Sequence, residues 1–208
     1  MFLNRKQLNK AMDDTEHNTT CSEETAYHEA GHAVIGSVFG RRVRMITCEG
    51  ELGCTIFSSS PINLNLSPRD LITGYVAGYV AEELWQHDLN NHSFSEIPFV
   101  ASSELISARI EGNCWANIND ATEAVENARK VLKGLSDPLS TITGFPAAET
   151  IALLEEIRIA EQRAARILWR RWEAVRVIAK ELHQWHWVLG CDIRDAIGAK
   201  WMKHASDE

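Results

Sequence analysis

The segment ETAYHEAGHAVIG, close to the start of the 208-residue chain, carries the pattern H-E-x-x-H at His28, Glu29 and His32. Two residues four apart lie on one face of a helix, so both imidazoles can reach a single metal ion. Ser22 is a suitable N-cap and Gly40 a suitable stop for such a helix. Apolar residues follow at helical spacing: Ala26, Ala30, Ala33, Val34, Val38 and Phe39. We therefore predict a helix with the motif inside it.

The motif admits two interpretations. In the first, both histidines hold zinc, which lowers the pKa of a bound water toward about 7, and Glu29 accepts the proton of that water. In the second, His28 and His32 are partly buried helix residues with satisfied hydrogen bonds. Only the first interpretation needs a third ligand from elsewhere in the chain.

Three acidic residues are candidates for this third ligand. Glu82 and Glu83 lie together in GYVAEELWQ, and Asp120 lies in NINDATEAVENARK at a predicted helix start. The positive end of a helix dipole keeps a carboxylate ionised, which suits a metal ligand. An aspartate in a first turn also serves simple capping, however, so these residues by themselves leave the choice open.

Four segments together resemble the FtsH-type zinc metallopeptidase domain. ETAYHEAGHAVIG, GELGCTIF, AGYVAEEL and NDATEAVENAR occur in the same order as matching segments of that family, over about residues 22–190. The resemblance is most specific at HEAGHA, which is identical, and at Asn119 and Asp120, which precede an Ala-Arg pair at the family's spacing.

The resemblance implies a role for each candidate residue. It implies that His28, His32 and Asp120 bind zinc and that Glu29 is the general base. Three further residues would either orient the metal ligands through outer hydrogen bonds or have a structural role only: Glu82, Glu83 and Asn119.

The chain also departs from this family. Where the family has two glycines and an arginine, the chain has Ala77, Gly78 and Tyr79, and the stretch from Glu83 to Asp120 is longer. The sequence contains no G-x-x-x-x-G-K-[ST] loop, which argues against ATP use, and it lacks the family's unfolding module and membrane segments. We expect a stand-alone, ATP-independent zinc endopeptidase that cleaves peptides or unfolded proteins.

An alternative function is a proteolytically inactive zinc-containing scaffold or regulatory subunit. Such a protein would keep the three ligands for stability and bind a protein partner through its tryptophan-rich C-terminal helices. The intact Glu29 argues against it, because a structural site needs no base. The sequence leaves open whether the chain acts alone, as a homo-oligomer or with a separate ATPase.

The remaining patterns predict a mainly α fold with a small β-hairpin. The hairpin surrounds EGELG, and a helix with Ser67 as N-cap runs to about Gln86. Gly74 and Gly78 in that helix predict a buried element that another backbone approaches closely. Further helices are expected at about 119–134, 147–172, 173–187 and 192–202. We predict a flexible arm over 1–21 and one peptidase-like domain over 22–208.

Composition limits the partners and the compartment. The net charge of −8 argues against a nucleic-acid partner, and no apolar run approaches the roughly 20 residues that span a bilayer. The polar N-terminus lacks the apolar stretch of a signal peptide. The cysteines are odd in number and widely spread, which predicts reduced thiols in a cytoplasmic protein: Cys21, Cys48, Cys54, Cys114 and Cys191.

Overall fold

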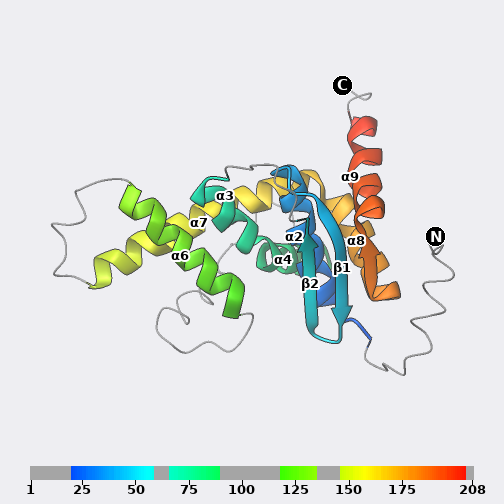
Figure 1. The fold of residues 1–208 in the computed structure, drawn as a ribbon, viewed down its shortest axis with the longest axis horizontal. Coiled ribbons are helices and arrows are strands. Elements are labelled where there is room, and N and C mark those ends of the chain that lie inside the picture. The colour runs from blue at the N-terminus through cyan, green and yellow to red at the C-terminus, as the bar shows by residue number, and fades with distance from the viewer. Residues whose placement is uncertain (1–19, 59–65, 90–117, 135–145, 205–208) are drawn as a thin grey trace.

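The computed structural model describes residues 20–58, 66–89, 118–134 and 146–204. These residues form helices and a small antiparallel sheet, which confirms the predicted fold class (Figure 1). The helices are α2 (Glu23–Val38), α3 (Pro68–Tyr75), α4 (Ala77–Leu89), α6 (Ile118–Gly134), α7 (Pro146–Arg170), α8 (Trp172–Trp185) and α9 (Gly190–His204). The strands are β1 (Val43–Glu49), β2 (Leu52–Phe57) and β3 (Trp187–Leu189).

Helix α2 occupies the centre of the fold. The Ser22 hydroxyl caps it by accepting from the Thr25 N–H at 3.0 Å, as predicted. The hairpin covers one side of α2, and α4 and α8 pack against other sides (Figure 1). This packing buries two polar residues of the helix, His28 and Glu29. The H-E-x-x-H segment is therefore part of the core.

The crossing of α2 and α4 depends on Gly31, the fourth residue of the H-E-A-G-H motif. A Cβ at this position would lie 2.5 Å from the Ala77 carbonyl oxygen. The close backbone approach predicted for Gly74 and Gly78 was thus assigned to the wrong glycines. A Cβ on Gly74 would have no heavy atom within 4 Å, and a Cβ on Gly78 would face a side chain.

The predicted helix from Pro68 to about Gln86 is two helices. Its N-terminus has the expected capping box between Ser67 and Asp70. Helix α3 ends at Tyr75, the Val76 N–H closes its last turn, and α4 begins at Ala77. Gly74, which lowers helix propensity by about 1 kcal/mol, lies just before this break. The break lets α3 and α4 take different directions over the motif (Figure 1).

The sheet has the order β2-β1-β3. The predicted hairpin is confirmed, with Thr47 opposite Cys54 and Cys48 opposite Gly53. Strand β3 was not predicted, because it has three residues and is defined only by its pairing with β1. Strand β2 is an edge strand of the sheet, and it packs against α2.

Cys21 and Cys48 form a disulfide, so the prediction of reduced thiols is wrong for this pair. The Ser22 N–H donates to the Gly50 carbonyl at 3.0 Å, which holds the start of α2 against the hairpin turn and brings the two cysteines together. Both are buried, whereas Cys54 and Cys191 are free and exposed. One basis of the cytoplasmic prediction is thereby removed.

Helix α7 holds α3 in place through two ion pairs. Arg69 of α3 donates two hydrogen bonds to the buried Glu156 of α7, at 3.0 and 2.8 Å. Arg163 of α7 pairs with Asp70 of α3 at 2.7 Å. These pairs fix α3, and with it the Gly74 carbonyl, relative to the core.

Two predictions fall outside this description. Residues 1–19 of the predicted N-terminal arm, and the segments 90–117 and 135–145, are not among the described residues.

Within the described ranges, none of the helices has both the length and the apolar composition needed to cross a bilayer.

Candidate metal centre

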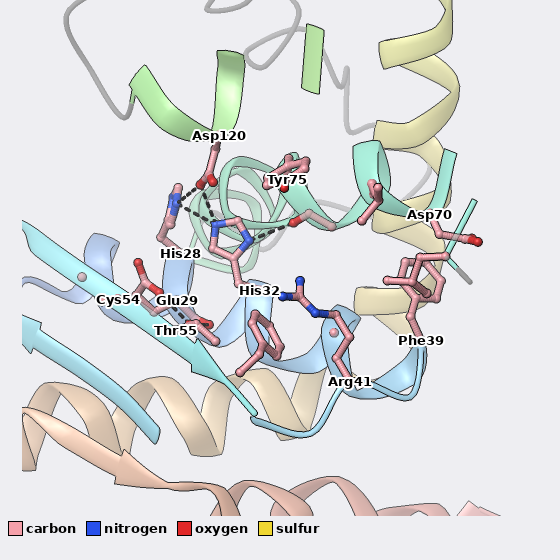
Figure 2. Close-up of a pocket in the computed structure, with 16 residues that line it drawn as sticks. His28, Glu29, His32, Phe39, Arg41, Cys54, Thr55, Asp70, Tyr75 and Asp120 are labelled. Carbon is pink, nitrogen blue, oxygen red and sulfur yellow. Dashed lines mark hydrogen bonds and ion pairs between the residues drawn. The ribbon is translucent and has the colours of Figure 1, made fainter. Parts of the chain in front are cut away.

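The two motif histidines point at the same place. Their Nε2 atoms lie 3.0 Å apart on one face of α2 (Figure 2). Asp120, in the first turn of α6, reaches them from the opposite side, with its Oδ2 2.9 Å from the Nε2 of His32 and 3.5 Å from that of His28. Three donor atoms from two distant helices therefore converge on one point.

This arrangement fits a zinc ion. Ligand atoms about 2.0–2.1 Å from a tetrahedral zinc lie about 3.3 Å from one another. The three separations of 2.9, 3.0 and 3.5 Å bracket that value. Two imidazoles and a carboxylate are donors that zinc accepts.

The other nitrogen of each histidine is already bonded. His32 Nδ1 donates to the Gly74 carbonyl oxygen at 2.8 Å, and His28 Nδ1 lies 2.5 Å from Glu82 Oε1. A carbonyl oxygen only accepts, so the Nδ1 of His32 carries a proton, and its Nε2 faces His28 and Asp120. Metal-binding histidines in proteins are generally held in this way by an outer carboxylate or carbonyl.

The buried His28 and the carboxylate of Asp120 shift each other's pKa values. Burial opposes a charge on His28, but hydrogen bonds with Asp120 and Glu82 outweigh it and raise the pKa of this imidazole to about 10. Burial likewise opposes ionisation of Asp120, yet its bonds with His28 and His32 hold its pKa far below the usual range. The opposite charges of His28 and Asp120 therefore stabilise each other.

Glu29 is held beside this cluster by strand β2. The Thr55 hydroxyl lies 2.6 Å from Glu29 Oε2, and Figure 2 shows the two side chains in contact below the histidines. A Cβ on Gly53 would lie 2.5 Å from Glu29 Cγ, so the strand can lie over the carboxylate only because residue 53 has no side chain. Glu29 is 6% exposed and still lines the cleft.

Two residues of α4, one aromatic and one glycine, shape the pocket of His28. The Tyr79 ring packs edge-on against the imidazole, with centroids 5.2 Å apart. A Cβ on Gly78 would overlap the His28 ring at Nε2, which is the proposed ligand atom. Gly78 is thus the position on α4 that leaves room for this ring.

We expect Gly78→Ala to weaken metal binding by about 10- to 100-fold, the usual effect of disturbing the groups around a ligand. The added methyl group must displace the His28 ring, which Glu82 holds from its other side. Titration of the metal-free protein with Zn²⁺ against a chromophoric chelator measures the change. Gly74→Ala is the matched control, because nothing lies within 4 Å of its added methyl group. Equal affinities for the two variants would contradict this role of Gly78.

The three donor atoms lie at one end of an open cleft of about 700 Å³. Strand β2 forms one wall, through Gly53, Cys54, Thr55 and Phe57, and α3 forms the other, through Asp70, Leu71, Gly74 and Tyr75. The end of α2 and the following loop add Phe39 and Arg41 (Figure 2). The donor atoms are therefore reached from the cleft.

Comparison with known proteins identifies a similar sequence. An ATP-dependent zinc metalloprotease FtsH from Aster yellows witches'-broom phytoplasma (strain AYWB) is 32% identical over 165 residues, covering 64% of this chain and 24% of that protein. The chain is related to FtsH over this part. It spans about a quarter of the length of FtsH. No protein-family model matches the sequence.

The structure brings together the residues that the FtsH resemblance singled out. His28, His32 and Asp120 form a group that could hold a metal ion, with Glu29 adjacent. Of the two glutamates considered as ligands, Glu82 instead bonds the outer nitrogen of His28. Neither Glu82 nor Glu83 belongs to that group. The side chain of Asn119 lies outside the described residues, and its role stays a prediction.

Sequence reasoning missed the supports of the site. Thr55 and Gly53 lie within GELGCTIF, which resembles an FtsH segment, but no local pattern connects them with Glu29. Tyr79 replaces the arginine of the FtsH-type pattern and packs on His28. Only the three-dimensional contacts reveal these roles.

Proposed function

We propose that the protein is a zinc-dependent endopeptidase that hydrolyses peptide bonds in peptides or unfolded proteins. The observation that carries this proposal is the convergence of His28, His32 and Asp120 beside the Glu29 carboxylate, at one end of an open cleft. The relationship to FtsH supports it, because that relative is a zinc metalloprotease.

His28, His32 and Asp120 would hold the zinc ion through Nε2, Nε2 and Oδ2. When bound, zinc supplies an acidified water and polarises the substrate carbonyl. Glu82 and the Gly74 carbonyl keep the imidazoles turned toward that position, which limits reorganisation during the reaction.

Glu29 supplies the proton transfer. Thr55 bonds one of its carboxylate oxygens, which fixes the plane of the group and leaves the other oxygen to accept a proton from the attacking water. The same carboxyl group then delivers this proton to the leaving amine.

The edge of β2 gives a physical reason for a peptide substrate. Within the described residues β2 pairs with β1 alone, so its other edge has backbone groups available next to the cleft. An extended peptide adds to such an edge through main-chain hydrogen bonds, which places its carbonyl groups along the strand. Binding of this kind favours unfolded chains, because a folded domain presents few free strands.

Zinc content and cleavage, measured on the same samples, test the proposal. We expect about one zinc per chain in the wild type and in Glu82→Ala, a strong loss in Asp120→Ala, and casein cleavage that a chelator abolishes and zinc restores. Glu82→Ala separates a ligand from an outer group, because it removes a carboxylate that contacts His28 without binding the metal, and it should keep the zinc stoichiometry while weakening zinc affinity by about 10- to 100-fold. Zinc without cleavage would favour the scaffold function, and a wild type without zinc affinity would refute the metal site.

A further inference from the structure

Arg41 places a positive charge in the cleft. It follows α2 in the loop to β1, where its backbone N–H donates to the Gly36 carbonyl at 2.8 Å. Its guanidinium lies over the Phe57 ring, 3.6 Å from the ring centroid. Arginine stacks well on aromatic faces, so Phe57 holds the side chain in a defined position while its N–H groups stay available.

Within the part of the chain that the structure describes, no carboxylate pairs with this guanidinium. Two neighbouring arginines are paired, Arg69 with Glu156 and Arg163 with Asp70. Among the described residues that line the cleft, Arg41 is the one arginine or lysine.

The surroundings of Arg41 suit an acidic group of a ligand. Figure 2 shows Arg41 rising into the cleft on the side of His32, away from Glu29. Tyr75, on the opposite wall, interacts electrostatically with the guanidinium. Burial lowers the pKa of Arg41, which remains charged, so part of the cost of removing the guanidinium from water is met on folding.

We propose that Arg41 binds a carboxylate of the peptide substrate, in the part of the cleft beside His32. This inference rests on the proposed peptidase function and specifies its substrate class. The carboxylate belongs to an aspartate or glutamate side chain, or to the C-terminus of the peptide. A planar guanidinium and a carboxylate form paired, charge-assisted hydrogen bonds, whereas a neutral amide leaves the charge unsatisfied.

A matched peptide set tests the inference. Each peptide carries either glutamate or glutamine at one position of an otherwise constant sequence, and each is made with a free C-terminus and with a C-terminal amide. We expect the wild type to prefer the acidic member by about 10- to 100-fold in kcat/KM at one position, the range that a charged hydrogen bond provides. A preference for the free C-terminus over the amide would instead identify the terminal carboxylate.

The variants then assign the preference to Arg41. In Arg41→Gln the ratio between acidic and neutral peptides is expected to fall to about one. Arg41→Lys, which keeps the charge and loses the planar group, should retain part of it. Arg42→Gln is the control, since Arg42 is the exposed neighbour and does not line the cleft. A wild-type ratio near one at every position and terminus, or an Arg41→Gln ratio equal to that of the wild type, would overturn the inference.

Binding separates this inference from the proposed function. Fluorescence anisotropy of labelled acidic and neutral peptides is measured on Glu29→Gln and on Glu29→Gln with Arg41→Gln. Cleavage without any acid preference leaves the peptidase function standing and removes the carboxylate site. Acid-selective binding that depends on Arg41, in a wild type that cleaves nothing, removes the peptidase function and keeps the carboxylate site.

Discussion

Replacing Glu29 with glutamine is expected to lower kcat for peptide hydrolysis by about 10²- to 10⁴-fold, the usual contribution of a positioned general base. Glutamine has nearly the same shape and can still accept the Thr55 hydrogen bond, but it cannot take up the proton of the attacking water. The residue is not one of the three ligand candidates, so zinc content should not change. Steady-state kinetics and metal analysis on one preparation measure both quantities.

Glu24→Gln is a suitable control for this experiment. Glu24 lies in the exposed first turn of the same helix, and its substitution removes the same charge without touching the cleft. It should leave kcat close to that of the wild type. Undiminished cleavage by a zinc-loaded Glu29→Gln protein would show that another group serves as the base.

Removing the disulfide between Cys21 and Cys48 is expected to lower the free energy of unfolding by about 3–4 kcal/mol. The cross-link joins residues 27 apart in sequence, and closing a loop of that length removes conformational freedom from the unfolded chain. Urea unfolding of the wild type and of a double Cys21→Ser, Cys48→Ser variant measures the difference. The variant should unfold at a clearly lower urea concentration.

The two exposed cysteines provide the control for the disulfide. A Cys54→Ser, Cys191→Ser variant should change the free energy of unfolding by less than about 0.5 kcal/mol for each site, as surface substitutions usually do. Alkylation of the unfolded, unreduced wild type should leave Cys21 and Cys48 unmodified. Labelling of both, or an unfolding midpoint that does not respond to their replacement, would contradict a stabilising cross-link.

The elements that were predicted correctly have local causes. Ser22 and Ser67 cap helices through bonds to residues three positions away, and the EGELG turn joins two strands next to each other in sequence. The features that were missed depend on contacts between distant segments. Strand β3 is defined by β1, and Cys21 meets Cys48 because the start of α2 rests on the hairpin turn.

The residues of the candidate site also fall into two groups, those predictable from local spacing and those brought together only by the fold. His28 and His32 could be paired from their helical spacing alone, but Asp120 is 88 residues further on, and only the resemblance to FtsH favoured it over Glu82. The roles of Thr55 and Gly78 follow from which strand and which helix cover α2. No spacing in the sequence encodes those neighbours.

The disulfide also closes a covalent ring that includes the helix with the motif. Residues 21–48 include all of α2 and the exposed loop at Gly40 and Arg42. A single cut of the backbone within this ring would leave the two fragments attached to each other, with both histidines still joined to the rest of the chain. The protein would thereby survive a nick at this position as one molecule, and would separate into two only when reduced and unfolded.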